Sequence, residues 1–376
     1  MTLLIRVFSL PVHGTRNMIL VLWYIKPGSQ LWVMLIMPLY HGLQKRIERK
    51  GHTLMKYYLA PMEGLTGCVY RSAYHACYLA MDKYFTPFIS PKANRGLSSR
   101  ELNDILPEHN QGMYVVPQIL TNRSQDFIRT AGELREYGYR EVNLNLGCPS
   151  GTVVSKHKGA GFLELPDSLD RFLDEVCGAM EGLGMELSVK TRLGMISPDE
   201  FPGLLAIYNR YPLKELILHP RVRADYYKNK PRMDAFSQGF EASRAPVCYN
   251  GDIFTAADCE TLSRQYPKLD RVMLGRGIIA NPGLLDEIAD HRDTEKETLE
   301  TFHRMVYEGY RQTISGDRNV LFKMKELWAC MIQIFSDNGT YIKKIKKSQR
   351  REEYEAAAAA VFRDLDIAEG AGFRTY

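Results

Sequence analysis

A cysteine in a tight turn is the residue of this sequence with the clearest chemical potential. The segment 141–151 reads EVNLNLGCPSG, in which apolar residues alternate with Asn143 and Asn145 before Cys148. Alternation with a period of two predicts a β-strand, and the glycine and proline that flank the cysteine end it sharply. Two amides and a thiol at a strand end suit the lining of a polar pocket. The alternative is a strand followed by an ordinary buried cysteine, because free cysteines are among the most buried residues.

Short apolar runs recur after residue 55, each ending in polar, glycine or proline residues. They predict strands over residues 57–62, 84–90, 114–120, 141–148, 187–193, 215–219, 246–252 and 270–275. Amphipathic helices are predicted between strands, for example over 125–137 and 168–180. This alternation favours an α/β fold, a (β/α)8 TIM barrel. The alternative, an open doubly wound sheet, normally shows G-x-G-x-x-G after its first strand, and residues 62–67 read MEGLTG.

Polar side chains gather where the predicted strands end, and in a (β/α)8 barrel these ends form the active face. The residues there are Pro61, Met62, Gln118, Asn145, Cys148, Lys190, Arg192, His219, Arg221, Asn250, Asp252, Gly275 and Arg276. Any one of them could simply cap its strand, but capping explains the whole ring poorly. The last two loops, 250–252 and 275–277, offer backbone N–H groups and a guanidinium where such barrels bind phosphate. We therefore expect a phosphate-containing cofactor.

Composition narrows the class of protein. The chain has 376 residues, 45% of them hydrophobic and 25% charged, which is typical of a globular protein with room for two domains. A net charge of +5 is compatible with a polyanionic partner without requiring one. The seven cysteines form no C-x-x-C pair and no cluster with histidine at metal-ligand spacing. We therefore expect no metal site, and reduced thiols in the cytoplasm.

Three regions of the chain differ in character. Residues 1–54 contain apolar runs at 18–25 and 31–40, but a polar KPGSQ segment separates them. This arrangement supplies neither a clean membrane span nor a signal-peptide cleavage site. We expect residues 1–54 to lie outside the fold, 55–293 to form the barrel, and 294–376 to form a C-terminal all-α domain.

The expected all-α domain has three predicted helices, over 294–315, 320–336 and 341–362. Aromatic residues are interleaved there with lysine and arginine, most densely over 343–351. This pattern suits contact with a nucleic-acid backbone. The alternative is an ordinary solvated helical face, on which lysines are common.

Several short motifs, in this order, resemble the tRNA-dihydrouridine synthase (Dus) family from about residue 56 to the late helices. They are APMEGLTG (60–67), NLGCPS (145–150), KGAG (158–161), SVKTRLG (188–194), HPR…Y (219–227), NGDI (250–253) and LGRG (274–277). The resemblance implies an FMN-dependent barrel with a helical tRNA-binding domain. Such an enzyme reduces the C5–C6 bond of uridines in tRNA, with NADPH or NADH as reductant. We expect a monomeric cytoplasmic protein that needs neither a metal nor a membrane.

The resemblance also implies roles for single residues. Cys148 resembles the general acid that protonates C5 of the uracil, a task that suits a thiol near neutral pH. Lys190 would stabilise negative charge near N1 of the reduced flavin, and Gln118 and His219 would contact FMN. The other implied FMN contacts are Pro61, Met62, Asn250, Gly251, Asp252, Gly275 and Arg276. The implied substrate contacts are Asn145, Arg192, Arg221 and Tyr227.

The loop after His219 departs from the family pattern H-x-R-T-R-x-Q-x-Y, since Val222 and Asp225 replace its threonine and glutamine. The resemblance therefore does not extend to an RNA contact at Asp225. Two other functions stay open. One is a different FMN barrel, similar to dihydroorotate dehydrogenase, that acts on a small pyrimidine. The other is a tRNA-binding protein or folding factor without catalytic activity.

Overall fold

The structure is a computed structural model that describes residues 5–12, 16–23, 55–92 and 96–374. The chain divides into a unit of residues 1–52 and a unit of residues 53–376. In the first unit, strands β1 (Ile5–Val12) and β2 (Arg16–Trp23) pair in antiparallel fashion. The predicted apolar run 31–40 lies outside the described residues.

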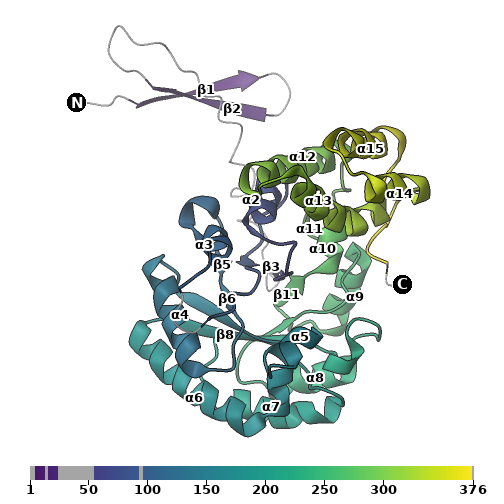
Figure 1. The fold of residues 1–376 in the computed structure, drawn as a ribbon. Helices are drawn as coiled ribbons and strands as arrows, with labels where there is room; N and C mark the ends of the chain where they lie inside the picture. Colours follow the sequence, from purple (N-terminus) through teal and green to yellow (C-terminus); the bar gives the residue numbers. More distant parts are fainter. Residues whose placement is uncertain (1–4, 13–15, 24–54, 93–95, 375–376) are drawn as a thin grey trace. The chain divides into compact units, whose positions relative to one another are not determined.

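The second unit is built around a parallel barrel (Figure 1), with strand order β5-β4-β3-β11-β10-β9-β8-β7-β6. The strands are β3 (Lys56–Leu59), β4 (Lys83–Phe85), β5 (Val115–Val116), β6 (Gln118–Ile119), β7 (Glu141–Leu146), β8 (Glu186–Arg192), β9 (Leu216–His219), β10 (Val247–Tyr249) and β11 (Arg271–Leu274). Pro117, which has no N–H to donate, separates β5 from β6. Because β5 pairs with β4 and β6 pairs with β7, this one segment joins both edges of the sheet. The predicted (β/α)8 barrel is confirmed.

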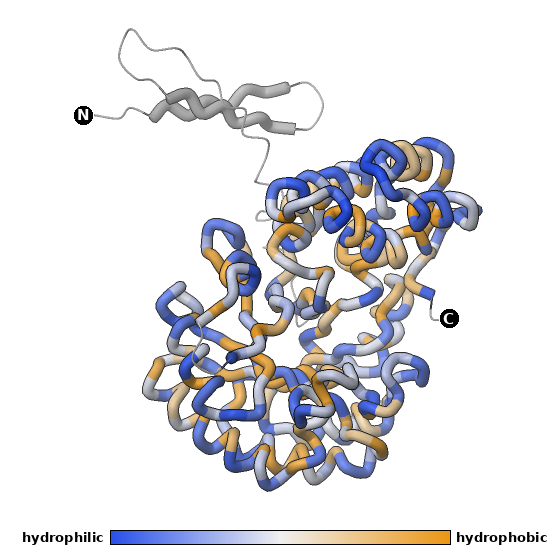
Figure 2. The backbone as a smooth tube through the Cα atoms, viewed as in Figure 1, coloured by the Kyte–Doolittle hydropathy of each residue, from blue (hydrophilic) through white to orange (hydrophobic). Residues whose placement is uncertain are grey.

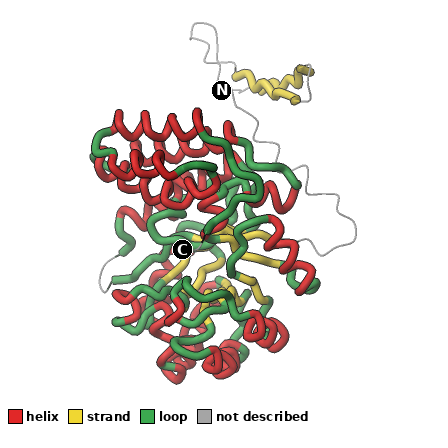
Figure 3. Tube along the Cα trace, turned by 90° about the vertical axis from the view of Figure 1, so that its right-hand side faces the viewer, coloured by secondary structure: helices red, strands yellow, loops and turns green. Residues whose placement is uncertain are grey.

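Helices follow the strands and surround the barrel, as Figures 1 and 3 show. They are α2 (Cys68–Cys77), α3 (Ser99–Ile105), α4 (Ser124–Glu136), α5 (Gly151–Val154), α6 (Pro166–Leu183), α7 (Phe201–Tyr208), α8 (Met233–Ala242), α9 (Ala256–Gln265), α10 (Arg276–Ala280) and α11 (Leu284–Asp290). Along the outer helices apolar and hydrophilic segments alternate (Figure 2). In α4 the apolar Phe127, Ala131 and Leu134 are buried, so the amphipathic pattern is what holds this helix against the barrel.

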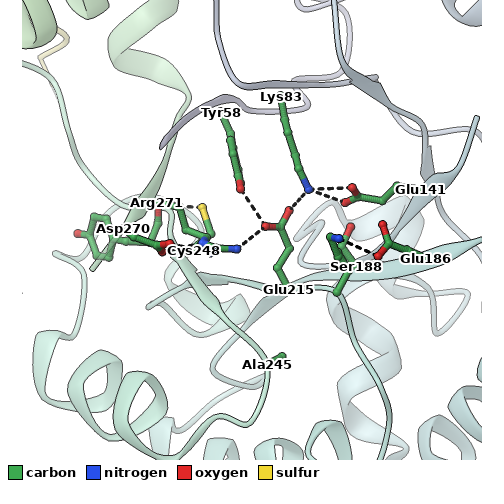
Figure 4. Close-up of polar contacts among 12 residues, drawn as sticks. Tyr58, Lys83, Glu141, Glu186, Ser188, Glu215, Ala245, Cys248, Asp270 and Arg271 are labelled. Carbon is green, nitrogen blue, oxygen red and sulfur yellow. Dashed lines mark hydrogen bonds and ion pairs between the residues drawn. The ribbon is translucent and has the colours of Figure 1, made fainter. Parts of the chain in front are cut away.

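An ionic cluster closes the barrel at the amino ends of its strands (Figure 4). Lys83 Nζ lies 2.8 Å from a carboxylate oxygen of Glu141 and 2.8 Å from one of Glu215. The second Glu215 oxygen accepts from Arg271 (3.1 Å) and from the Tyr58 hydroxyl (2.9 Å). We call Lys83, Glu141, Glu215 and Arg271 the basal cluster. Each of these charges has an opposite charge as its partner, as burial requires.

Four helices follow the barrel, namely α12 (Lys296–Thr313), α13 (Asp317–Met331), α14 (Gly339–Lys347) and α15 (Arg351–Asp364). The ring of Phe302 in α12 packs edge-on against Tyr70 of α2, with centroids 5.3 Å apart. The prediction of one helix over 341–362 is wrong, because the chain turns between α14 and α15. The Ser348 hydroxyl donates to the Ile345 carbonyl (2.7 Å), and Glu353 caps the new helix by accepting from backbone N–H groups before it. No helix among the described residues is long and apolar enough to cross a membrane.

Candidate active site

The turn after β7 holds Cys148 in a defined position at the carboxyl end of the barrel. The Asn145 side-chain oxygen accepts hydrogen bonds from the N–H groups of Gly147 (3.1 Å) and Cys148 (3.0 Å). Arg192 Nε, from the end of β8, donates to the Gly147 carbonyl (2.8 Å). Gly159 lies so close that a Cβ there would be 2.9 Å from Cys148 Cβ. Contacts on several sides thus hold the turn in place, while Cys148 itself stays only partly buried.

The electrostatics keep this thiol protonated. Burial raises the pKa of Cys148, and the backbone hydrogen bond at Ser150 and the nearby Arg192 offset this only in part. A thiol with a raised pKa carries its proton at neutral pH, so it is equipped to donate one rather than to attack as a thiolate.

Lys190 is the unpaired cation of the site. It lies beside Asn145 in the β7–β8 register, and its ammonium forms no hydrogen bond or ion pair with any other residue that the structure describes. Burial and the neighbouring Arg192 lower the pKa of Lys190 to about 8. A desolvated ammonium without a partner is unfavourable in itself, and it therefore points to an anionic ligand.

A chain of side-chain hydrogen bonds links the neighbouring strands β6, β7 and β8 beneath the turn. The Asn145 amide donates to Gln118 (2.6 Å), the Gln118 amide donates to Asn143 (2.7 Å), and the Asn143 amide donates to the Ser188 hydroxyl (3.0 Å). Gln118, Asn143 and Ser188 are fully buried, and Asn145 is nearly so. These hydrogen bonds fix the Asn145 side chain, and through it the Cys148 turn. Sequence reasoning missed Ser188, although its place two residues before Lys190 in an alternating strand was a usable signal.

A second network joins the ends of β9, β10 and β11. Arg221, which is buried, donates to His219 Nε2 (2.9 Å) and to both carboxylate oxygens of Asp252. Arg276 donates to the same carboxylate (2.5 Å). Since arginine can only donate, His219 Nε2 accepts and the ring proton sits on Nδ1. Burial and the surrounding cations, Arg192 first, lower the pKa of His219 well below its usual value, so the ring is neutral.

The ring of Tyr227 lies over this network and is 46% exposed. The guanidinium carbons of Arg276 and Arg192 lie 4.6 and 5.3 Å from its centroid, and the His219 ring lies 5.9 Å away. The structure therefore brings three of the four predicted substrate residues, Arg192, Arg221 and Tyr227, around His219, and it puts Asn145 under the Cys148 turn.

The remaining predicted FMN contacts lie around the first and last strands. Met62 packs on the barrel interior, and a Cβ at Gly275 would lie 3.8 Å from its sulfur. Pro61 precedes Met62 and lies two residues after the end of β3. The Asn250 amide donates to the Met273 carbonyl (2.9 Å). A Cβ at Gly251 would lie 2.0 Å from the Tyr249 hydroxyl oxygen, so this close approach requires glycine.

These residues fit a flavin phosphate better than a metal. Four cations, Lys190, Arg192, Arg221 and Arg276, meet at the mouth, and Asp252 is the one carboxylate that pairs with any of them among the described residues. Such a surplus of positive charge suits a phosphate and an electron-rich ring. Within the described part of the chain, no group of three or more His, Cys, Asp or Glu residues is arranged to hold a metal ion.

Asp225 has a structural task that the sequence did not reveal. Its carboxylate accepts from the Val222 N–H (2.9 Å), the Asn229 amide (2.5 Å) and both terminal nitrogens of Arg232. Burial raises the pKa of Asp225, but the bonds from Arg232 and Asn229 outweigh it and lower the pKa to about 2. The carboxylate therefore ties the loop together and leaves no lone pair aimed at a ligand.

The fold and site define a parallel barrel with a protonated thiol and an unpaired lysine at its carboxyl end. Residues 58–366 match the model of the dihydrouridine synthase (Dus) family. The chain belongs to this family.

Curated relatives agree with the family match. The chain is 30% identical over 267 residues to a protein of Staphylococcus aureus named "Probable tRNA-dihydrouridine synthase". The alignment covers 68% of this chain and 78% of the relative. It is 29% identical over 258 residues to the "tRNA-dihydrouridine(16) synthase" of Pseudomonas putida, and this alignment covers 67% of this chain and 79% of the relative. Among solved structures, a variant of NCR from Zymomonas mobilis aligns with a TM-score of 0.45 and 14% identity, covering 69% of this chain and 92% of that one.

Proposed function

We propose that this protein is a tRNA-dihydrouridine synthase that adds one hydride and one proton across the C5–C6 bond of a uridine in tRNA. The observation that carries the proposal is a protonated thiol, Cys148, held at a barrel mouth beside the unpaired Lys190, in a chain that belongs to the Dus family. The reduction balances because the hydride goes to C6, the proton goes to C5, and a nicotinamide cofactor supplies the electrons.

FMN, when bound, supplies the hydride. The ammonium of Lys190 would meet the N1 edge of the ring, where negative charge gathers on reduction. The Gln118 amide has a second N–H with no partner among the described residues, and it would donate to the ring. Arg276, with the backbone of the Asn250 and Gly275 loops, would hold the phosphate. NADPH or NADH would be the reductant.

Cys148 would deliver the proton to C5 of the uracil. Its raised pKa leaves the proton on the sulfur at neutral pH, and the Asn145 bonds to the turn set where the sulfur points. Tyr227, Arg192 and Arg221 would shape the pocket for the base. Because a uridine inside folded tRNA is stacked, the base must leave its stack to reach this mouth.

The helical domain would bind the tRNA backbone. Lys343, Lys344, Lys346 and Lys347 are exposed on α14, and none forms an ion pair with another described residue. Each phosphate that such a lysine neutralises adds about one unit to the slope of log affinity against log salt. Replacing all four by glutamine should lower this slope, and an unchanged slope would place the tRNA elsewhere.

The test is nucleoside mass spectrometry of dihydrouridine-free tRNA after incubation with the FMN-loaded protein and NADPH or NADH. We expect dihydrouridine at a defined position, and no turnover of free uridine or orotate. Reduction of a free pyrimidine without any product in tRNA would contradict the proposal in favour of a small-pyrimidine reductase. A protein that does not bind FMN would contradict every flavin mechanism.

A further inference from the structure

The loop between β9 and α8 is a closed strap. The Arg232 N–H donates to the Pro220 carbonyl (2.7 Å), which ties the two ends together. Asp225 binds Asn229 and Arg232 inside the strap, and Arg221 Nε donates to the Asn229 carbonyl (2.5 Å). These hydrogen bonds therefore hold the tip of the strap, around Tyr226, in one conformation.

Tyr226 occupies a position at this tip that suits glycine. Its backbone has φ +51° and ψ −96°, and the Lys228 N–H donates to the Asp225 carbonyl (2.9 Å). These angles match the first central position of a type II′ turn, which glycine dominates because a side chain is strained there. A tyrosine at this position costs conformational free energy.

Packing does not account for that cost. The Tyr226 side chain is 40% exposed, and its ring contact is with the guanidinium of Arg223, 5.0 Å from the centroid. The next residue, Tyr227, lies over the active site, and consecutive Cα atoms are about 3.8 Å apart. Tyr226 is therefore the immediate chain neighbour of a residue that covers the mouth, and it is itself exposed.

The surroundings of Tyr226 are cationic. Arg223, Lys228 and Lys230 form no ion pair with any described residue, and Arg223 Nε is buried without a hydrogen-bond partner. The carboxylate of the strap, Asp225, is occupied by Arg232. An aromatic face among unpaired cations is the combination that binds unpaired nucleotides, by stacking on the base and pairing with the phosphate.

We propose that Tyr226 stacks on the base of a nucleotide that neighbours the target uridine, and so holds the tRNA open while the target enters the pocket. The inference rests on the proposed function and extends it to a second nucleotide. Arg223 orients the ring and, with Lys228 and Lys230, contacts the adjoining phosphates.

The test compares Tyr226→Gly with Tyr226→Phe. Glycine removes the ring and relieves the turn, so this variant should be at least as thermostable as the wild type. Its kcat/KM for tRNA should fall about tenfold, the scale of one lost base–aromatic stack. Phenylalanine keeps the ring and should retain wild-type kcat/KM. Flavin reduction by NADPH without tRNA should be unchanged in both variants.

A second substrate sharpens the test. The position of dihydrouridine is first mapped with the wild type, and tRNAs are then made with an abasic nucleotide on its 5′ or its 3′ side. We expect at least one abasic tRNA to lower kcat/KM of the wild type. With that tRNA, Tyr226→Gly should have the same kcat/KM as with intact tRNA, because the stacked base is already missing. Equal kcat/KM for Tyr226→Gly and wild type, or additive losses with both abasic tRNAs, would overturn the inference and leave the proposed function standing. A wild type that makes no dihydrouridine would instead overturn the proposed function.

Discussion

The two ends of the barrel treat charge in opposite ways. At the amino ends, the two carboxylates of the basal cluster, Glu141 and Glu215, enclose Lys83, and Glu215 also binds Arg271. At the carboxyl ends, Lys190 has no partner among the described residues, and of the three arginines at the mouth, Arg221 and Arg276 share the carboxylate of Asp252.

The difference shows which end is built for stability and which for chemistry. A buried charge that is fully paired strongly resists removal of one partner, because the other is left uncompensated. A buried charge that is left unpaired lowers stability, and it is retained where a ligand needs it. The basal cluster therefore belongs to the fold, and the mouth is set up for an electron-rich cofactor and a polyanionic substrate.

Lys83→Met should cause the largest change at the basal cluster. It leaves the two carboxylates Glu141 and Glu215 together without their shared cation, which should lower the free energy of unfolding by about 3–5 kcal/mol at pH 7. Burial already raises the pKa of Glu141, and loss of Lys83 raises it further, so Glu141 takes up a proton as pH falls. Part of the stability should therefore return between pH 7 and about 5.

Chemical denaturation measures this effect, and Lys214→Met is the matched control. Lys214 makes an exposed pair with Glu186 (2.7 Å) near the amino end of β8, and its loss should cost less than about 1 kcal/mol. Equal losses in the two variants would mean that the basal cluster contributes no more than a surface pair.

Lys190→Met should show the opposite behaviour at the mouth. Removal of an unpaired, desolvated cation should leave the apoprotein as stable as the wild type or more stable. The rate of flavin reduction should fall about 10²-fold, since charge stabilisation at the ring is lost. Denaturation of the apoprotein and stopped-flow absorbance of the holoprotein give the two readouts. A large loss of stability would show that Lys190 has a structural partner after all.

The pH dependence of flavin reduction should report Lys190. Its pKa is lowered to about 8, so the ammonium is charged below that pH and loses its proton above it. The rate of flavin reduction should accordingly fall as pH rises through about 8. Lys190→Arg, which stays charged, should move this alkaline limb upward, whereas a limb that stays at the same pH in the variant would assign it to another group.

Asn145→Ala should produce the smallest of these effects. The variant removes two hydrogen bonds from the Cys148 turn, each contributing about 1 kcal/mol, and we expect about a tenfold loss in dihydrouridine formation with flavin reduction retained. Asn209→Ala is the control, because the Asn209 amide, directly after α7, also donates to a backbone carbonyl, that of Ala242 at the end of α8 (2.9 Å). Equal activity of both variants would remove Asn145 from the positioning of Cys148.

The sequence predicted the barrel and the face that bears the site because both depend on local patterns. Alternating runs that end at polar residues set the strands and their carboxyl ends. The contacts between those ends are long-range, and no pattern near Gln118 says that its amide joins Asn145 to Asn143. The basal cluster could have been predicted from the sequence, because Glu141 and Glu215 begin two of the predicted strands.

Three other features could not be predicted from the sequence, each for its own physical reason. The split of β5 from β6 follows from the missing N–H of Pro117 inside an otherwise clear strand. The division of the predicted helix 341–362 depends on the Glu353 cap, which competes with helical continuation through Ser348. The task of Asp225 depends on Arg232, which only the folded strap brings to it.

The most direct measurement compares Cys148→Ala with Cys177→Ala, a thiol on α6 outside the barrel mouth. Both holoproteins are reduced with NADPH, mixed with dihydrouridine-free tRNA, and analysed for dihydrouridine by mass spectrometry. We predict that both variants reduce their flavin at the wild-type rate, and that Cys148→Ala alone loses product formation, by about 10²- to 10⁴-fold. Undiminished dihydrouridine formation by Cys148→Ala would contradict the assignment of this thiol as the acid, and with it the account of the barrel mouth.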